Sequence, residues 1–115
     1  MIAYMQQISF NVQEPYHSFL ISGKKTIEGR LNKGKFAQVK KRDTLLLAPH
    51  DVPFKVVGTK VYKLFADMLE SEGVRQVTPD KTSIGDAVAV YYSFYTPADE
   101  KKFGVVAILL ERLTK

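Results

Sequence analysis

The sequence contains no cysteine, so disulfides, thiolate metal sites and cysteine nucleophiles are excluded. Histidine is scarce as well. His17 and His50 are the only two and lie 33 residues apart, an arrangement that does not favour a zinc site. No serine lies in a G-x-S-x-G elbow, which argues against a Ser-His-Asp hydrolase. Any catalysis must therefore rely on lysine, glutamate, threonine or tyrosine, and we expect no metal and no cofactor.

Long apolar runs are also missing. No stretch approaches the roughly 20 residues that cross a bilayer, so we expect no contact with a membrane. The first 13 residues carry no positive charge ahead of their apolar residues, unlike a secretion signal. The sequence thus predicts a cytoplasmic protein.

The composition is that of a globular protein. Of its 115 residues, 45% are hydrophobic and 25% are charged, which is enough apolar side chain to offset the entropy lost on folding. We find no repeat, linker or low-complexity tract. The sequence therefore predicts a single domain over residues 1–115.

Positive charge is concentrated in one part of the chain. The net charge is +5, from 17 basic and 12 acidic residues. Eight basic residues fall in a 19-residue window with Glu28 as its one acidic residue before Asp43: Lys24, Lys25, Arg30, Lys33, Lys35, Lys40, Lys41 and Arg42. Such a window attracts polyanions such as nucleic acids. A solvated basic surface without a partner would show the same pattern, and charge alone does not separate the two.

The segment around this window predicts a helix followed by a strand. Residues 13–22 predict a helix with Pro15 in its first turn and Gly23 as a left-handed cap. Residues 26–31 alternate as a strand does, with Thr26, Glu28 and Arg30 on one face. The polar trio is therefore expected to point in one direction.

The remaining segments complete an α+β pattern. We predict strands over 44–48, 54–62 and 103–113, a helix over 64–72 and a turn at 52–54. Residues 32–43 read as a basic loop with a helical turn near Ala37, 74–80 as irregular and 97–102 as a polar loop. Residues 83–95 fit either a strand or a helix. A capping box of Ser83 and Asp86 favours the helix, which gives a small curved sheet or barrel with three helices.

The octapeptide "GKKTIEGR" resembles the G-x-K-x-x-E-x-R signature of the ASCH family, the activating-signal-cointegrator homology domains. The matching positions are Gly23, Lys25, Glu28 and Arg30. The order of the later segments is also similar, from "RDTLLL" through "FADMLESEG" and "VYYSFY" to "KKFGVVAI". The resemblance covers nearly the whole chain and is strongest to small stand-alone archaeal and bacterial members.

The resemblance implies a PUA-like β-barrel of about five or six strands, with a cleft lined by the signature residues. It also implies binding of RNA or of a modified nucleoside. Some ASCH proteins deacylate N4-acetylcytidine with a lysine, a threonine and a glutamate, and others have been proposed as ribonucleases. Matched by position, the lysine is Lys25, the threonine is replaced by Glu28, and the glutamate lies near Glu72 or Glu70.

The residues themselves allow several roles. Burial and neighbouring cations would lower the pKa of Lys25 and favour a base or nucleophile, whereas Glu28 favours a simple ion pair. Glu28 could accept from the exocyclic amine of a base and Arg30 could bind phosphate. Tyr92 and Tyr95 are candidate stacking residues, whereas Tyr91 and Phe94 are predicted to belong to the core.

Three functions remain open at this stage. The first is a non-catalytic RNA- or nucleoside-binding module, with Lys25, Glu28, Arg30, the basic loop and the two tyrosines in the binding surface. The second is a hydrolase, either an amidohydrolase or a ribonuclease, with Lys25, Glu28 and Glu72 as catalytic residues. The third is a domain that uses its basic patch to bind an acidic protein.

Overall fold

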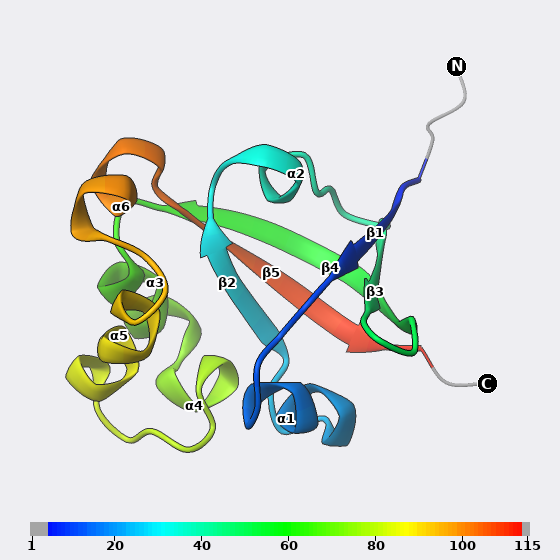
Figure 1. Cartoon of the computed structure of the whole chain (residues 1–115), viewed down its shortest axis with the longest axis horizontal. Coiled ribbons are helices and arrows are strands. Elements are labelled where there is room, and N and C mark those ends of the chain that lie inside the picture. The colour runs from blue at the N-terminus through cyan, green and yellow to red at the C-terminus, as the bar shows by residue number, and fades with distance from the viewer. Residues whose placement is uncertain (1–4, 114–115) are drawn as a thin grey trace.

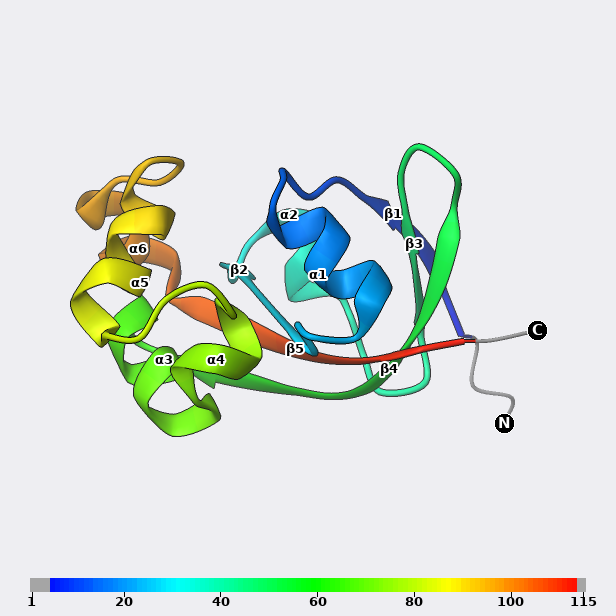
Figure 2. The ribbon, with the colours of Figure 1, turned by 90° about the horizontal axis from the view of Figure 1, so that it is seen from below.

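A computed structural model describes residues 5–113, which form a curled five-stranded sheet flanked by helices (Figures 1 and 2). The sheet order is β1-β3-β4-β5-β2, with β1 parallel to β3 and all other pairs antiparallel. The strands are β1 (Gln7–Phe10), β2 (Ile27–Leu31), β3 (Thr44–Leu47), β4 (Val52–Tyr62) and β5 (Val105–Arg112). The α+β class and the strand number agree with the sequence-based prediction.

The helices are α1 (Tyr16–Ser22), α2 (Gly34–Ala37), α3 (Phe65–Glu72), α4 (Val74–Val77), α5 (Ile84–Tyr92) and α6 (Pro97–Phe103). Figure 1 shows α3 to α6 gathered at one end of the sheet, with β1 and β3 at the other. None of the helices in this described part of the chain is long and apolar enough to span a membrane.

Strand β5 is covered on both faces and connects two hydrophobic clusters. Val106, Ile108 and Leu110 join the cluster formed by α1, β1, β3 and β4. Val105 and Ala107 join the cluster formed by α3, α4 and α5. The alternation follows from the two-residue period of a strand, and it explains why this segment is continuously apolar.

The predicted number of three helices is wrong, because the described residues form six helical segments. Residues 97–103 form α6 and not a polar loop, since the Thr96 hydroxyl accepts from the Asp99 N–H and Pro97 occupies the first turn. Residues 74–77, predicted as irregular, form the short helix α4.

Other boundaries also differ from the prediction. Residues 52–54 belong to β4 and pair with β3, so the turn lies before them. Strand β1 was not predicted, because its four residues lack a distinctive pattern and their pairing with β3 is long-range. Pro15 is the N-cap of α1, which begins at Tyr16. The helix over 83–95 is confirmed as α5, and the Ser83 hydroxyl accepts from the Asp86 N–H.

The sheet is open, with β1 and β2 as its two edge strands. Side chains from the β2 side cross the gap between these edges. Arg30 Nη2 donates to the Asn11 carbonyl, and Lys35 Nζ donates to the Ser9 carbonyl at 2.5 Å. The predicted barrel is therefore a curled half-barrel whose opening is bridged by two cationic side chains.

Candidate functional site

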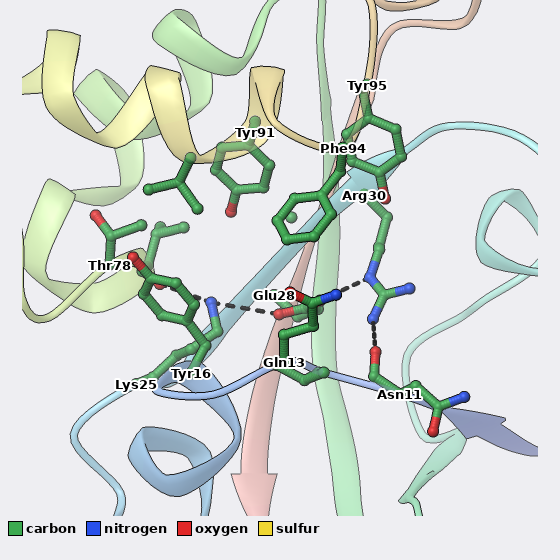
Figure 3. A pocket seen from close by; sticks show the side chains of 14 residues that line it. Asn11, Gln13, Tyr16, Lys25, Glu28, Arg30, Thr78, Tyr91, Phe94 and Tyr95 are labelled. Carbon is green, nitrogen blue, oxygen red and sulfur yellow. Dashed lines mark hydrogen bonds and ion pairs between the residues drawn. The ribbon is translucent and has the colours of Figure 1, made fainter.

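A cavity of about 410 Å³ lies beside strand β2, between the segment that follows β1 and the end of α5 (Figure 3). Its volume is within the range of about 300–1,000 Å³ typical of small-molecule sites. Residues of four chain segments (11–16, 25–30, 77–78 and 90–95) line it, so the cavity is a product of the tertiary fold. Its lining combines aromatic rings with a cluster of buried charges.

The charges at the cavity are the buried Lys25 and Glu28 and the partly buried Arg30, and Glu28 lies within hydrogen-bonding reach of both cations. Glu28 Oε1 lies 3.3 Å from Lys25 Nζ, and Glu28 Oε2 lies 2.6 Å from Arg30 Nε. Lys25 Nζ also donates to the carbonyls of Ile27 at 2.5 Å and Val77 at 2.6 Å. These three acceptors match the three donors of an ammonium group, so they fix the position of the Lys25 side chain.

Burial shapes the ionisation of this cluster. Burial lowers the pKa of Lys25, and the Glu28 carboxylate opposes that change without cancelling it. Burial raises the pKa of Glu28, but the charges of Lys25 and Arg30 more than offset this, so the Glu28 pKa lies below its ordinary value. Two cations and one carboxylate leave the cluster with a net positive charge, which favours an anionic or electron-rich ligand.

Arg30 is held from several sides. Burial lowers its pKa and the Glu28 carboxylate raises it, with a net increase that keeps the guanidinium charged. The guanidinium carbon lies 4.4 Å from the centre of the Phe36 ring and 5.9 Å from that of Phe10. Together with its bond to Asn11, these contacts fix the guanidinium at the edge of the cavity.

Aromatic rings form much of the remaining wall. Tyr91 stacks on Phe65 with centroids 4.2 Å apart and an interplanar angle of 10°, and Tyr95 stacks on the same ring at 5.6 Å. Tyr91 is buried as predicted. Phe94 was expected in the core, but its side chain is 51% exposed beside the cavity, because helix α5 has already ended at Tyr92. The cavity thus offers an accessible stacking surface.

Three of the candidate residues from the sequence do not line this cavity. Glu72 lies on α3, where its carboxylate accepts from the Tyr62 hydroxyl and lies 3.8 Å from Lys60 Nζ. Tyr92 donates its hydroxyl to Glu100 at 2.6 Å. Thr26 donates to the Gln76 side chain at 2.9 Å. It precedes β2, which begins at Ile27, so the predicted alternation applies to Glu28 and Arg30 and not to Thr26.

The basic residues of the window divide into two groups. Lys25 and Arg30 belong to the cavity. Six others are exposed outside it: Lys24, Lys33, Lys35, Lys40, Lys41 and Arg42. Lys35 is bound to the Ser9 carbonyl, and Lys33 lies 4.8 Å from the centre of the Phe103 ring. The exposed group therefore lies outside the cavity and does not form its floor.

Comparison with known proteins identifies the fold family. A family model of the ASCH domain matches residues 10–114. The chain belongs to the ASCH domain family. This confirms the resemblance carried by Gly23, Lys25, Glu28 and Arg30. No curated protein matched this ASCH domain.

Solved structures agree with the assignment. The crystal structure of hypothetical protein PH0355 is 41% identical with a TM-score of 0.90, covering 94% of this ASCH domain and 100% of that chain. The solution NMR structure of PF0455 from Pyrococcus furiosus is 36% identical with a TM-score of 0.81, covering 96% and 100%. The crystal structure of a ZmASCH mutant from Zymomonas mobilis is 13% identical with a TM-score of 0.56, covering 92% of this ASCH domain and 68% of that chain. At this identity the similarity is one of fold alone.

Several lining residues of this ASCH domain were missed from the sequence. Asn11 and Gln13 come from the segment between β1 and α1, Tyr16 is the first residue of α1, and Thr78 follows α4. Their sequence context is ordinary, and they become neighbours of Glu28 only through tertiary contacts. The position of Gln13 beside the charge cluster could not have been predicted from spacing in the sequence.

The described residues also bear on metal binding. Among residues 5–113, no group of three His, Asp or Glu side chains is arranged to hold a metal ion. Each carboxylate oxygen of Glu28 is already paired with a cation.

Proposed function

We propose that this ASCH domain binds RNA or a free nucleoside, and that a single nucleobase enters the cavity. The observation that carries the proposal is the pairing of an aromatic wall with a positively charged cluster in one hollow. Proteins that read unpaired bases stack them on aromatic side chains and hydrogen-bond their edges. Phe94, accessible at the cavity, is the residue best placed to stack.

The exposed basic residues extend the same proposal to the nucleic-acid backbone. Lys24, Lys40 and Lys41 are exposed, and no side-chain partner is recorded for them within residues 5–113. Lysines of this kind neutralise phosphates, which makes affinity fall steeply with salt. In this proposal, residues 1–115 act as a single cytoplasmic domain that binds RNA.

The test is the affinity for short single-stranded RNA at two salt concentrations. Each phosphate contact contributes about 0.7 to the slope of log affinity against log salt. Lys40→Gln with Lys41→Gln should reduce that slope. The matched control is Lys60→Gln with Lys63→Gln, two exposed lysines at and just after the end of β4 that do not line the cavity, which should leave it unchanged. A flat salt response, or no binding to any RNA, would refute the proposal.

A second variant tests the stacking surface. Phe94→Ala removes a ring that is half exposed, so the fold should be retained while affinity falls by about 1–3 kcal/mol. Val61→Ala, at a side chain that is 64% exposed on β4 and outside the cavity, serves as its control. Equal affinities for the two variants would exclude Phe94 as a stacking residue.

One observation favours a hydrolase as a second candidate function. Burial lowers the pKa of Lys25 inside the cavity, as a lysine base or nucleophile requires. In that case N4-acetylcytidine, or a phosphodiester of RNA, would be the substrate, with Lys25 and Glu28 at the reacting bond. Glu72 would not take part, because it does not line the cavity.

Incubation with N4-acetylcytidine tests this candidate through the release of acetate. Under the hydrolase hypothesis, Lys25→Met and Glu28→Gln stop turnover while Glu72→Gln does not, with folding of each variant checked by circular dichroism. Absence of turnover by the wild type, and of RNA cleavage in a parallel assay, would remove the hydrolase.

A further inference from the structure

Strand β2 has one free edge, and its polar groups can be assigned by alternation. Leu110 N–H donates to the Thr26 carbonyl and Asn32 N–H donates to the Gly104 carbonyl. Even-numbered residues of β2 therefore direct their main-chain groups toward β5, and odd-numbered residues direct theirs away from it. Gly29, which lies opposite Ala107, is one of the odd-numbered residues.

The neighbouring odd-numbered carbonyls on this edge already have partners. The Ile27 carbonyl accepts from Lys25 Nζ, and the Leu31 carbonyl accepts from the Lys33 N–H. No side chain among residues 5–113 hydrogen-bonds to the main chain of Gly29. Since glycine has no side chain, its contribution to the cavity wall is main chain. Its N–H donor and C=O acceptor lie side by side on the edge of β2 that is turned away from β5, at a residue that lines the cavity.

The Tyr91 hydroxyl is a second unused polar group at the same place. Tyr91 is 7% exposed, and its hydroxyl has no hydrogen-bond partner within the described chain. Figure 3 shows this hydroxyl pointing into the cavity. It lies near Gly29, since a Cβ on that glycine would be 2.8 Å from the hydroxyl oxygen. No fully buried side-chain oxygen among the described residues lacks a partner, so this hydroxyl is reached from the cavity and is available to a ligand.

We propose that the main-chain N–H and C=O of Gly29, with the Tyr91 hydroxyl beside them, recognise the edge of a planar heterocycle that carries an acceptor next to a donor. This rests on the proposed function and specifies how the base is read. Ring nitrogen N3 and amine N4 of cytosine have this arrangement, as do O4 and N3–H of uracil. A ligand without a donor at this edge leaves the Gly29 carbonyl unpaired.

A peptide strand would be the other natural partner of a free strand edge. The surroundings favour the ring, because Tyr16, Phe94 and Tyr95 close the cavity around this edge with flat surfaces. An extended peptide also requires a row of free groups, whereas the carbonyls on either side of Gly29 are occupied.

The experiment is a titration of ¹⁵N-labelled protein with adenosine, cytidine, guanosine and uridine, following the Gly29 amide resonance. Each pyrimidine nucleoside is compared with an analogue that lacks the donor, N4,N4-dimethylcytidine or N3-methyluridine. We expect at least one parent nucleoside to move the Gly29 amide proton downfield. We also expect loss of the donor to weaken binding about tenfold or more.

Two tyrosine variants test whether the Tyr91 hydroxyl itself contributes to binding. Tyr91→Phe removes an unpartnered hydroxyl and keeps the ring stacked on Phe65, so affinity should fall about 2- to 10-fold with the melting temperature unchanged. Tyr92→Phe removes a hydroxyl that is bonded to Glu100 outside the cavity, and affinity should stay the same.

The possible outcomes distinguish this inference from the proposed function. Nucleoside binding that leaves the Gly29 amide unmoved and is insensitive to donor loss overturns the inference alone. Absence of binding by every nucleoside and by single-stranded RNA overturns both. A Gly29 response to an extended hexapeptide, with none to nucleosides, overturns the inference in favour of strand addition.

Discussion

Tyr91 can lie against the edge strand β2 because residue 29 is glycine. A Cβ atom at position 29 would lie 2.8 Å from the Tyr91 hydroxyl oxygen and 2.8 Å from Met68 Cε. Both neighbours belong to the hydrophobic cluster under α3 and α5. The close approach brings α5 against the edge of β2 beside the cavity. Gly29 therefore affects both the packing of the core and the shape of the candidate site.

Replacing this glycine should be destabilising. Gly29→Ala introduces a methyl group into a packed contact, and we expect a loss of about 1–3 kcal/mol in the free energy of unfolding. Urea-induced unfolding measures it. Gly85→Ala is the control, because a Cβ at that position meets nothing within 4 Å and lies on α5 itself. A Gly29→Ala protein as stable as the Gly85→Ala protein would contradict the close approach.

The Glu28 carboxylate should be essential to the buried charge cluster. Glu28→Gln leaves Lys25 and Arg30 as buried cations without a counter-charge, which we expect to cost about 3–5 kcal/mol of stability. Lys60→Gln provides the comparison, since Lys60 is 61% exposed and lies 3.8 Å from Glu72. Because Lys60 is exposed and the contact is long, this pair should be worth less than about 1 kcal/mol. Similar losses in thermal and urea unfolding would count against the buried cluster.

Protonation of Glu28 should lower the stability of the protein in acid. Burial raises the pKa of Glu28, but Lys25 and Arg30 bring it below the ordinary value of 4.5. The folded protein therefore binds fewer protons than the unfolded chain, so the contribution of Glu28 is present above pH 4.5 and is lost as pH falls further. Unfolding free energies measured between about pH 5 and pH 2 should fall less steeply for Glu28→Gln than for the wild type.

Arginine at position 30 should not be replaceable by lysine. Its guanidinium donates to both Glu28 and the Asn11 carbonyl while it stacks on Phe36. An ammonium group cannot reproduce that geometry, so we expect Arg30→Lys to lose about 1–2 kcal/mol of unfolding free energy.

Arg112→Lys is the matched substitution for this prediction. Arg112 makes a single exposed bond, from Nη1 to the Ile21 carbonyl at 2.6 Å, which lysine can replace. Equal unfolding midpoints in urea for the two variants would show that the bridge between β2 and the segment after β1 contributes nothing.

Local sequence patterns determined much of the secondary structure and part of the site. Glu28 and Arg30 alternate with Ile27 and Leu31, so the strand and the shared direction of the two charges could be predicted. Ser83 with Asp86 distinguished a helix from a strand of similar composition. Thr96, Pro97 and Asp99 carry the same type of capping signal for α6, so that missed helix was predictable in principle.

The tertiary structure alone decided which residues share the cavity. Lys25 bonds to the carbonyl of Val77, 52 residues away, and Arg30 bonds to that of Asn11, 19 residues away. Sequence spacing carries no information about such contacts, because they depend on how the sheet curls and where α5 packs. Glu72 illustrates the consequence, since a plausible glutamate lies on α3 bonded to Tyr62. The sequence by itself determined the family, the charges and most local elements; long-range packing determined the hollow in which only some of those charges meet.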